Sequence, residues 1–154
     1  MNNAHVAHNC RIGHRAIIAG GALVAGYVEV GDAAFISGNC VVHQFVRVGR
    51  LAMLRGLSRT SRDVPPFCIM DGTHTVRALN RVGLRRVGFS GEQIRALHRA
   101  FVRLFRARGN LRHAVAELSA QPHTPEVEEL LAFIRGSTRG VCFGPRAAAD
   151  DGDG

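Results

Sequence analysis

Residues 4–54 read AHVAHNCRIGHRAIIAGGALVAGYVEVGDAAFISGNCVVHQFVRVGRLAML. Every sixth residue in this stretch is aliphatic, without exception: Val6, Ile12, Ile18, Val24, Val30, Ile36, Val42, Val48 and Leu54. The residue two places earlier is small or slender each time, and the residue that follows is mostly Ala, Gly or Ser. An α-helix would repeat near 3.6 residues and an ordinary strand every 2, so the period of six excludes both. The stretch predicts a parallel β-helix of hexapeptide repeats.

The repeat also supplies a coordinate system. Three hexads make one triangular coil of about 18 residues, and successive coils stack about 4.8 Å apart, so residues 18 apart lie above one another. We expect the aliphatic residue to point into the prism, with the small residue beside it. The Gly or Ala that follows is expected to permit the tight corner. Hexapeptide solenoids wind left-handed, against the usual right-handed crossover preference.

The hexad phase predicts where the solenoid ends. Thr60 breaks the aliphatic phase, and Pro65-Pro66 is expected to forbid further ladder bonds, which gives a left-handed β-helix over 1–63. A connector over 64–89 is expected to wrap the last coil and cover its open end. The tail, 145–154, has the composition of a disordered segment.

From Ser90 the period becomes helical, which predicts a helical subdomain over 90–144. Ser90 and Gln93 form a capping box ahead of an apolar stripe that Gly109 ends. A second, short helix is marked by Leu111, Val115 and Leu118. Thr124 and Pro125 open a third helix, which ends at Gly136. The fold class is therefore mainly β with a carboxy-terminal α-helical part.

Composition narrows the class of partner. The chain has 154 residues, 46% of them hydrophobic, which suits one globular domain with an appendage. All 20 basic residues are Arg, and the net charge is +8. Such an excess favours an anionic partner, whether nucleic acid, a phosphate-bearing substrate or an acidic protein, although the coding composition of the organism explains exclusive Arg equally well. With one Tyr, no Trp and no reader motif, nucleic-acid binding has little support.

The four cysteines show neither a disulfide framework nor a zinc-type CxxC spacing, so a reducing cytoplasm is the simplest setting. The amino terminus lacks the pattern of a signal peptide, and no apolar run reaches the length of a membrane span.

One column of the predicted prism carries chemistry. His8, Gly26 and Gln44 are 18 residues apart, so they lie above one another just outside the prism, and His43 adjoins Gln44. An imidazole beside a glycine amide provides a base for a hydroxyl nucleophile and a donor for the oxyanion of acyl transfer. A corner histidine without catalytic function is the alternative explanation.

Two further candidate sites compete with this column. His5, His8 and His14 lie near one another in sequence, but they occupy different phases of the repeat and lack an acidic partner, which disfavours a metal site. The cluster Arg81, Arg85 and Arg86 is either a solvated face or a pyrophosphate site.

At these residues the chain resembles the UDP-N-acetylglucosamine O-acyltransferase family, which performs the first acylation of lipid A biosynthesis. The resemblance runs from residue 1 to about residue 143, and HxAHxC in register with VHQF is its most specific part. The stretches that match are His5-Val6-Ala7-His8-Asn9-Cys10, Val42-His43-Gln44-Phe45, Asp63-Val64-Pro65-Pro66-Phe67, Asn80-Arg81-Val82-Gly83-Leu84-Arg85-Arg86, Gly88-Phe89-Ser90 and Ser137-Thr138-Arg139-Gly140.

The resemblance implies a role for each matching residue. His8 matches the general base, which takes the proton of the sugar 3-hydroxyl as that oxygen attacks a 3-hydroxyacyl thioester on acyl carrier protein. Gly26 matches the residue whose amide faces the oxyanion. Positions that line the nucleotide-sugar and donor sites are matched by His5, His43, Gln44, Asn80 and Arg86. The region that measures acyl length is matched by Met53, Gly56 and His74, and Gly56 leaves room for a longer chain.

The resemblance also implies a cytoplasmic homotrimer with sites between neighbouring subunits and no metal. The acidic carrier protein gives the positive surface a partner. Tyr27 stands where the family usually has a His, so we expect one substrate contact to be lost. Asn9 replaces an Asp of the family, so we expect the His8 imidazole to be oriented less firmly. Val87 and Arg55 replace an Arg and a Gly.

Met1 aligns inside the family's solenoid, so coils that contribute an Asp and a Lys to substrate binding have no counterpart in this sequence. We expect a carboxy-terminal fragment or a reading frame with a misplaced start, or else a naturally shortened trimer that has lost catalysis. The leading functional hypothesis is O-acyl transfer from acyl carrier protein to UDP-N-acetylglucosamine. A non-catalytic trimeric scaffold and an N-acyltransferase acting on a 3-amino sugar nucleotide are the alternatives.

Overall fold

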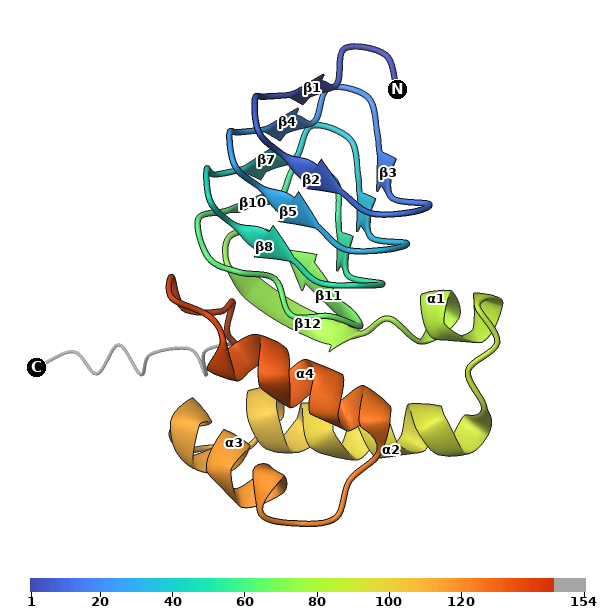
Figure 1. Ribbon diagram of the computed structural model, residues 1–154, viewed down its shortest axis with the longest axis vertical. Helices are drawn as coiled ribbons and strands as arrows, with labels where there is room; N and C mark the ends of the chain where they lie inside the picture. The colour runs from blue at the N-terminus through green and yellow to red at the C-terminus, as the bar shows by residue number, and fades with distance from the viewer. Residues whose placement is uncertain (146–154) are drawn as a thin grey trace, which may run out of the picture.

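The computed structural model describes residues 1–145, and Figure 1 shows a triangular solenoid above a layer of helices. The predicted disordered tail lies, apart from Pro145, outside the described residues. The solenoid is built from ten two-residue strands: β1 (His5–Val6), β2 (Arg11–Ile12), β3 (Ile17–Ile18), β4 (Leu23–Val24), β5 (Glu29–Val30), β6 (Phe35–Ile36), β7 (Val41–Val42), β8 (Arg47–Val48), β9 (Met53–Leu54) and β10 (Arg59–Thr60).

The strands form three parallel sheets, one for each face of the prism. Face 1 is β1-β4-β7-β10, face 2 is β2-β5-β8, and face 3 contains β3-β6-β9. His5 pairs with Leu23 and Leu23 with Val41, so partners are 18 residues apart, as predicted. The predicted left-handed parallel β-helix is confirmed. We call the corner between faces 1 and 2 the first edge, that between faces 2 and 3 the second edge, and that between faces 3 and 1 the third edge.

The aliphatic residue of each hexad fills the prism. Val24, Ile36, Val42 and Leu54 are fully buried, and the small residues two places earlier, such as Ala34, pack beside them. In the first coil the same positions are open to solvent: Val6 is 41% exposed. The solenoid core therefore begins in the second coil and deepens towards the helices.

The corners are made differently from the prediction. The left-handed backbone conformation falls three residues after the aliphatic position, at residues such as Asn9, Tyr27 and Phe45, rather than at the Gly or Ala directly after it. The small residue is needed for another reason. A Cβ on Gly31 would lie 2.5 Å from the backbone nitrogen of Arg50 in the next coil, so close stacking, not a positive φ, excludes larger side chains there.

The sequence predicted that the β-ladder would stop at the two prolines, but it continues past them. Val64 bridges Val48, 16 residues away instead of 18, and face 3 continues through β11 (Cys68–Asp71), which pairs with β9 in parallel. Pro65 and Pro66 lie between these two pairings, at the second edge, where no ladder donor is required. β12 (Thr75–Leu79) then returns antiparallel to β11 and ends the sheet.

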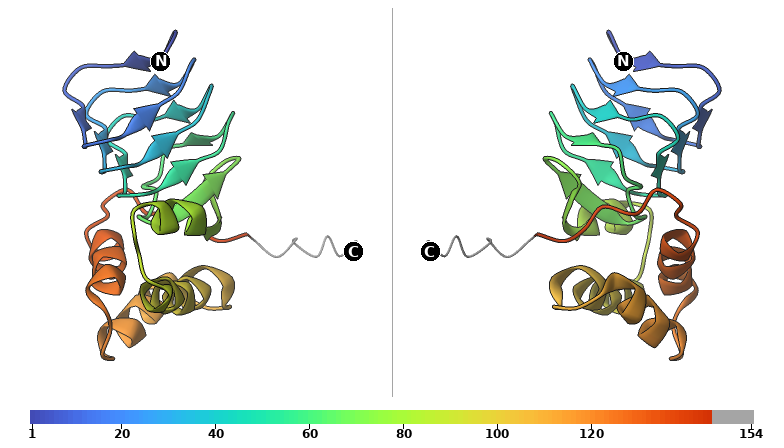
Figure 2. Two further views of the ribbon diagram at one scale, coloured as in Figure 1. Left: turned by 90° about the vertical axis from the view of Figure 1, so that its right-hand side faces the viewer. Right: turned by 90° about the vertical axis from the view of Figure 1, so that its left-hand side faces the viewer.

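Four α-helices follow within residues 1–145, and Figures 1 and 2 show those that come after the connector beneath the lower end of the prism. The helix α1 (Arg81–Arg86) lies inside the connector and was not predicted. Ser90 and Gln93 make the predicted capping box at the start of α2 (Gly91–Phe101). A π-helical turn, η1 (Val102–Arg106), extends α2, and α3 (Leu111–Ser119) and α4 (Pro125–Arg135) form at the predicted places.

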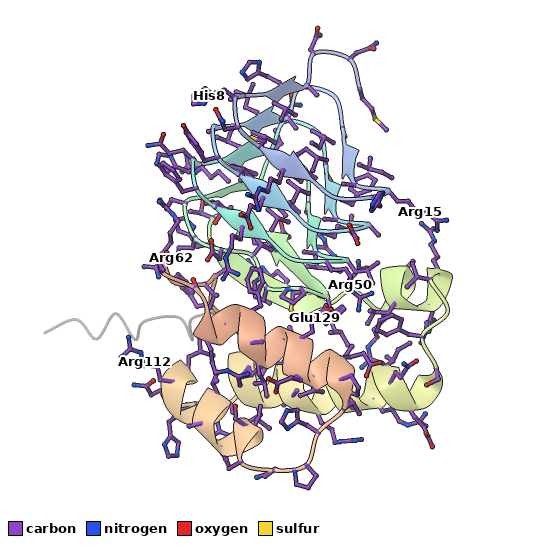
Figure 3. The ribbon with its side chains drawn as sticks, viewed as in Figure 1. His8, Arg15, Arg50, Arg62, Arg112 and Glu129 are labelled. Atoms are coloured by element: carbon purple, nitrogen blue, oxygen red, sulfur yellow. The ribbon has the colours of Figure 1, made fainter. Side chains whose placement is uncertain are left out.

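Two arginines of the solenoid, Arg47 and Arg50, bind the helix α4 to the region of face 2. The Arg50 Nε donates to both carboxylate oxygens of Glu129, at 3.2 and 3.1 Å, and the Arg47 guanidinium lies 4.2 Å from the centre of the Phe133 ring. Figure 3 shows Arg50 and Glu129 meeting at this junction. Helices and solenoid therefore share one continuous core.

Candidate active site

The parallel pairing of face 1 brings His8 and Gly26 together at the first edge. The Tyr27 N–H donates to the His8 carbonyl oxygen at 3.1 Å, which fixes the two coils in register. A Cβ built on Gly26 would lie 2.9 Å from His8 Cε1 and 3.1 Å from Nε2. The imidazole therefore rests directly on the glycine, and any larger residue at position 26 would displace it.

Asn9 orients the His8 ring. The His8 Nδ1 lies 3.1 Å from the Asn9 side-chain oxygen, and because that oxygen only accepts, the hydrogen bond assigns the proton to Nδ1. Nε2 is left with its lone pair and bonds to no other residue of the described chain. An imidazole in this tautomer is ready to accept a proton at Nε2.

The backbone of Gly26 offers a free donor next to this base. Its carbonyl oxygen accepts from the Phe45 N–H at 3.1 Å, whereas its own N–H finds no acceptor within residues 1–145. Gly26 is buried beneath the imidazole, so the donor is sheltered from bulk water. A sheltered, unpaired N–H is the kind of group that stabilises a developing oxyanion.

Two aromatic rings complete the neighbourhood of His8. The Tyr27 ring meets the imidazole edge-on, with centroids 5.3 Å apart, and stacks on Phe45 at 5.1 Å. From the sequence alone, Tyr27 stood out only as a departure from a family pattern. The spacing of 18 between residues 9, 27 and 45 was the available signal that these side chains form one column.

His5, His43 and Gln44 share this side of the molecule. His5 lies on β1 of face 1, while His43 and Gln44 follow β7 and turn into the first edge two coils below His8. All three side chains are exposed. The structure thus gathers five of the predicted site residues, His8 and Gly26 among them, along face 1 and the first edge.

Asn80 and Arg86 lie elsewhere. The Asn80 amide donates to the Leu51 carbonyl oxygen at 2.8 Å and accepts from the Gly83 N–H at 3.1 Å, so it is buried and caps α1 at the second edge. Arg86 is exposed in the last turn of the same helix. Figures 1 and 3 place α1 on the side of the molecule away from His8, so one chain does not bring these groups together.

The residues of the predicted acyl-length region are also spread out. Met53 is half-buried on β9 of face 3, and Gly56 follows at the third edge. His74 lies in the turn between β11 and β12, where Nδ1 is 3.2 Å from Thr60 Oγ1 and Nε2 is 3.5 Å from Ser61 Oγ. Burial, followed by the charges of Arg62 and Arg59, lowers the pKa of His74, so its neutral form is favoured.

The other features considered from the sequence are a metal site, a membrane span, the cysteines and the arginine cluster of α1. Within residues 1–145, no group of three or more His, Cys, Asp or Glu is arranged to hold a metal, and no helix is long and apolar enough to cross a membrane. Burial raises the pKa of the Cys142 thiol to about 11. Arg81 and Arg85 are exposed on α1 without an ion-pair partner among the described residues.

Comparison with known proteins places the chain in a family. The family model described as "Udp N-acetylglucosamine O-acyltransferase; Domain 2" matches residues 63–142. The chain belongs to the UDP-N-acetylglucosamine O-acyltransferase family. A curated relative from Thermodesulfovibrio yellowstonii, acyl-[acyl-carrier-protein]–UDP-N-acetylglucosamine O-acyltransferase, is 46% identical over 144 residues. That match covers 92% of this chain and 56% of the relative.

Solved structures of the family share the fold. The UDP-N-acetylglucosamine acyltransferase from Campylobacter jejuni superposes with a TM-score of 0.86 at 37% identity, covering 92% of this chain and 56% of that one. The Francisella novicida enzyme gives a TM-score of 0.88 at 29% identity, covering 95% and 54%. The chain thus spans little more than half the length of these members of the UDP-N-acetylglucosamine O-acyltransferase family.

Proposed function

We propose that the protein transfers a 3-hydroxyacyl group from acyl carrier protein to the 3-hydroxyl of UDP-N-acetylglucosamine. The observation that carries the proposal is the contact between His8 and Gly26. This contact brings the His8 imidazole, whose Nε2 makes no hydrogen bond, next to the backbone N–H of Gly26, which has no acceptor in the described chain. The name of the Thermodesulfovibrio relative supplies the two substrates.

The reaction follows from the two groups. His8 Nε2 takes the proton of the sugar hydroxyl as its oxygen attacks the thioester carbonyl carbon. The carbonyl oxygen becomes an oxyanion, which accepts a hydrogen bond from the Gly26 N–H. When the tetrahedral intermediate collapses, the C–S bond breaks and the departing thiolate of the carrier takes the proton back from His8. The Asn9 oxygen holds Nδ1–H throughout and so stabilises the imidazolium.

The distribution of the remaining site residues supports a homotrimer with sites between subunits. His8, His43 and Gln44 lie along the first edge of one chain, whereas Asn80 and Arg86 lie at the second edge. A single site that contains both groups needs the second edge of a neighbouring copy. The exposed apolar side chains of face 1, Leu23 and Val41, are suited to the contact that such a neighbour would bury.

Unpaired positive charge supports an acidic donor. The guanidinium groups of Arg59, Arg62 and Arg139 form no ion pair with a carboxylate of residues 1–145. Arg139 lies near the other two arginines because its Nε donates to the carbonyl oxygen of Ser61, the residue next to Arg62. Figure 3 shows Arg62 on the same side as His8, below it. An acidic carrier protein that approaches this side would meet three unneutralised cations.

The test is transfer by the purified chain from 3-hydroxyacyl carrier protein to UDP-N-acetylglucosamine. His8→Ala is expected to lower kcat by about two to four decades. His113→Ala, at an exposed position on α3, serves as the matched control and leaves the rate unchanged. An equal rate in wild type and His8→Ala would exclude the proposed base and favour a non-catalytic scaffold.

Two further measurements address the acceptor and the assembly. Because Tyr27 stands beside the base, competition between UDP-N-acetylglucosamine and its 3-amino analogue decides between ester and amide formation. Sedimentation of the purified chain is expected to give a single trimeric species. Monomers or heterogeneous aggregates would contradict a site shared between copies.

A further inference from the structure

The Tyr27 side chain is packed between two rings of the first edge. Its backbone N–H donates to the His8 carbonyl oxygen at 3.1 Å, and its φ of 59° directs the side chain outward along the column. The interplanar angle is 87° with the His8 ring in the coil above and 17° with Phe45 in the coil below. Tyr27 thus contacts His8 through both its backbone and its ring.

This packing decides what the aromatic pair can do. Tyr27 is 47% exposed and Phe45 52% exposed, which by itself would suggest a stacking platform for substrate. However, the Phe45 ring already stacks on the Tyr27 ring and the His8 ring contacts it at right angles, so the Tyr27 ring has two aromatic neighbours within its own chain. The ring is better placed to hold a neighbour than to bind a ligand.

The neighbour it holds is the candidate base. Asn9 fixes the His8 ring at Nδ1, and Gly26 supports it from below, but neither contact prevents the side chain from swinging outward into solvent. The Tyr27 ring provides the third contact of the imidazole, at right angles and with the ring centroids 5.3 Å apart. Edge-to-face aromatic contacts of this kind favour one arrangement by about 2- to 12-fold.

We propose that Tyr27 is a positioning residue that keeps the His8 imidazole on Gly26, with Phe45 as its backing. The inference rests on the proposed function of His8 as the base. It predicts that the aromatic ring of Tyr27, not its hydroxyl, is the group that matters. Loss of the ring should lower the fraction of His8 in the productive rotamer and leave substrate contacts intact.

Two variants and a control separate these possibilities. Tyr27→Phe keeps the ring, and Tyr27→Asn removes it while remaining compatible with the left-handed backbone. Arg15→Asn makes the same backbone change at another exposed left-handed corner, far from His8 in Figure 3. We expect kcat to fall about 3- to 10-fold in Tyr27→Asn with KM unchanged, and to stay within about twofold of wild type in Tyr27→Phe and Arg15→Asn.

A second readout does not require activity. In protein labelled with 13C at histidine Cε1, the His8 resonance is assigned with His8→Gln. We expect it to move towards the position of a free imidazole in Tyr27→Asn and to stay in place in Tyr27→Phe and Arg15→Asn. If this pattern appears while wild-type protein transfers no acyl group, the positioning stands and the proposed function fails. An unmoved resonance in Tyr27→Asn, or equal damage from Tyr27→Phe, overturns the positioning by the ring.

Discussion

The carboxylate of Asp63 accepts a hydrogen bond from the Ser137 hydroxyl at 2.7 Å, across 74 residues of sequence. Its other oxygen accepts from the backbone N–H of Arg47 at 2.8 Å, and the Arg47 Nε lies 3.4 Å from the oxygen that accepts from Ser137. Asp63 is only 1% exposed. One buried carboxylate therefore joins the last solenoid coil to the segment that follows α4.

Removing this carboxylate should destabilise the whole chain. We expect Asp63→Ala to lower the free energy of unfolding by about 2–4 kcal/mol, because it leaves the Arg47 N–H and the Ser137 hydroxyl without their acceptor. Asp63→Asn keeps an acceptor oxygen and should cost less. Urea denaturation provides the measurement, with Asp71→Ala as control, because its ion pair with Arg55 is largely exposed and should contribute under about 1 kcal/mol. Equal losses in Asp63→Ala and Asp71→Ala would contradict this account.

A methyl group at position 26 should displace the base. In Gly26→Ala the new Cβ would lie within 2.9 Å of the His8 ring, a distance that forces the imidazole to move. We expect acyl transfer to fall about 100-fold or more, since the base and the oxyanion donor are disturbed together. Gly91→Ala meets only the flexible end of Arg95 and should retain full activity. Normal activity in Gly26→Ala would mean that the His8–Gly26 contact is not catalytic.

The hydrogen bond from Asn9 should contribute to kcat. Asn9→Gly keeps the left-handed backbone, with φ of 60° in the wild type, but removes the oxygen that accepts from Nδ1. One neutral hydrogen bond corresponds to about a 3- to 10-fold lower kcat. Asn9→Asp offers a charged acceptor and should match or exceed the wild type. The ranking Asp, Asn, Gly in steady-state rates is the expected result, and the reverse ranking contradicts it.

His74 should make stability depend on pH. Its pKa lies below the ordinary 6.5 because of burial and then the charges of Arg62 and Arg59. A group with a lowered pKa stays neutral in the folded state, so its stabilising contribution is complete above pH 6.5 and is lost as the pH falls. We expect the free energy of unfolding to decrease from pH 7 to pH 5, and to decrease less in His74→Gln. His98, whose pKa is also lowered, adds to the residual slope, whereas His123, whose pKa is raised by its hydrogen bonds with Gln121 and Glu128, opposes it. Parallel pH curves for the two proteins would refute the assignment.

Thiol reactivity should distinguish Cys10 from the other cysteines. Cys40, Cys68 and Cys142 are buried, and burial raises the pKa of each thiol, whereas Cys10 is only half-buried. A thiol reagent at pH 8 should modify one cysteine per native chain quickly and the rest only on unfolding. Cys10→Ser should abolish the fast phase. A fast phase that survives this substitution would place the reactive thiol elsewhere.

Much of the solenoid was predictable because its sequence signal is local and repeated. Nine aliphatic residues in phase define the prism, and a period of 18 converts sequence distance into vertical position. That conversion was enough to bring His8 above Gly26 without any structure. The capping box at Ser90 and the start of α4 after Thr124 are equally local, since each is decided within four residues.

Tertiary structure decided the features for which the sequence has no shared period. The β-ladder continues past Pro65 and Pro66 because both prolines fall at an edge of the prism. The Asn80 side chain donates a hydrogen bond to the carbonyl oxygen of Leu51, 29 residues away. Tyr27 gains its role only from rings in adjacent coils. A repeat fixes the direction in which a side chain leaves the prism. Which group it meets there depends on packing between segments that no local pattern relates.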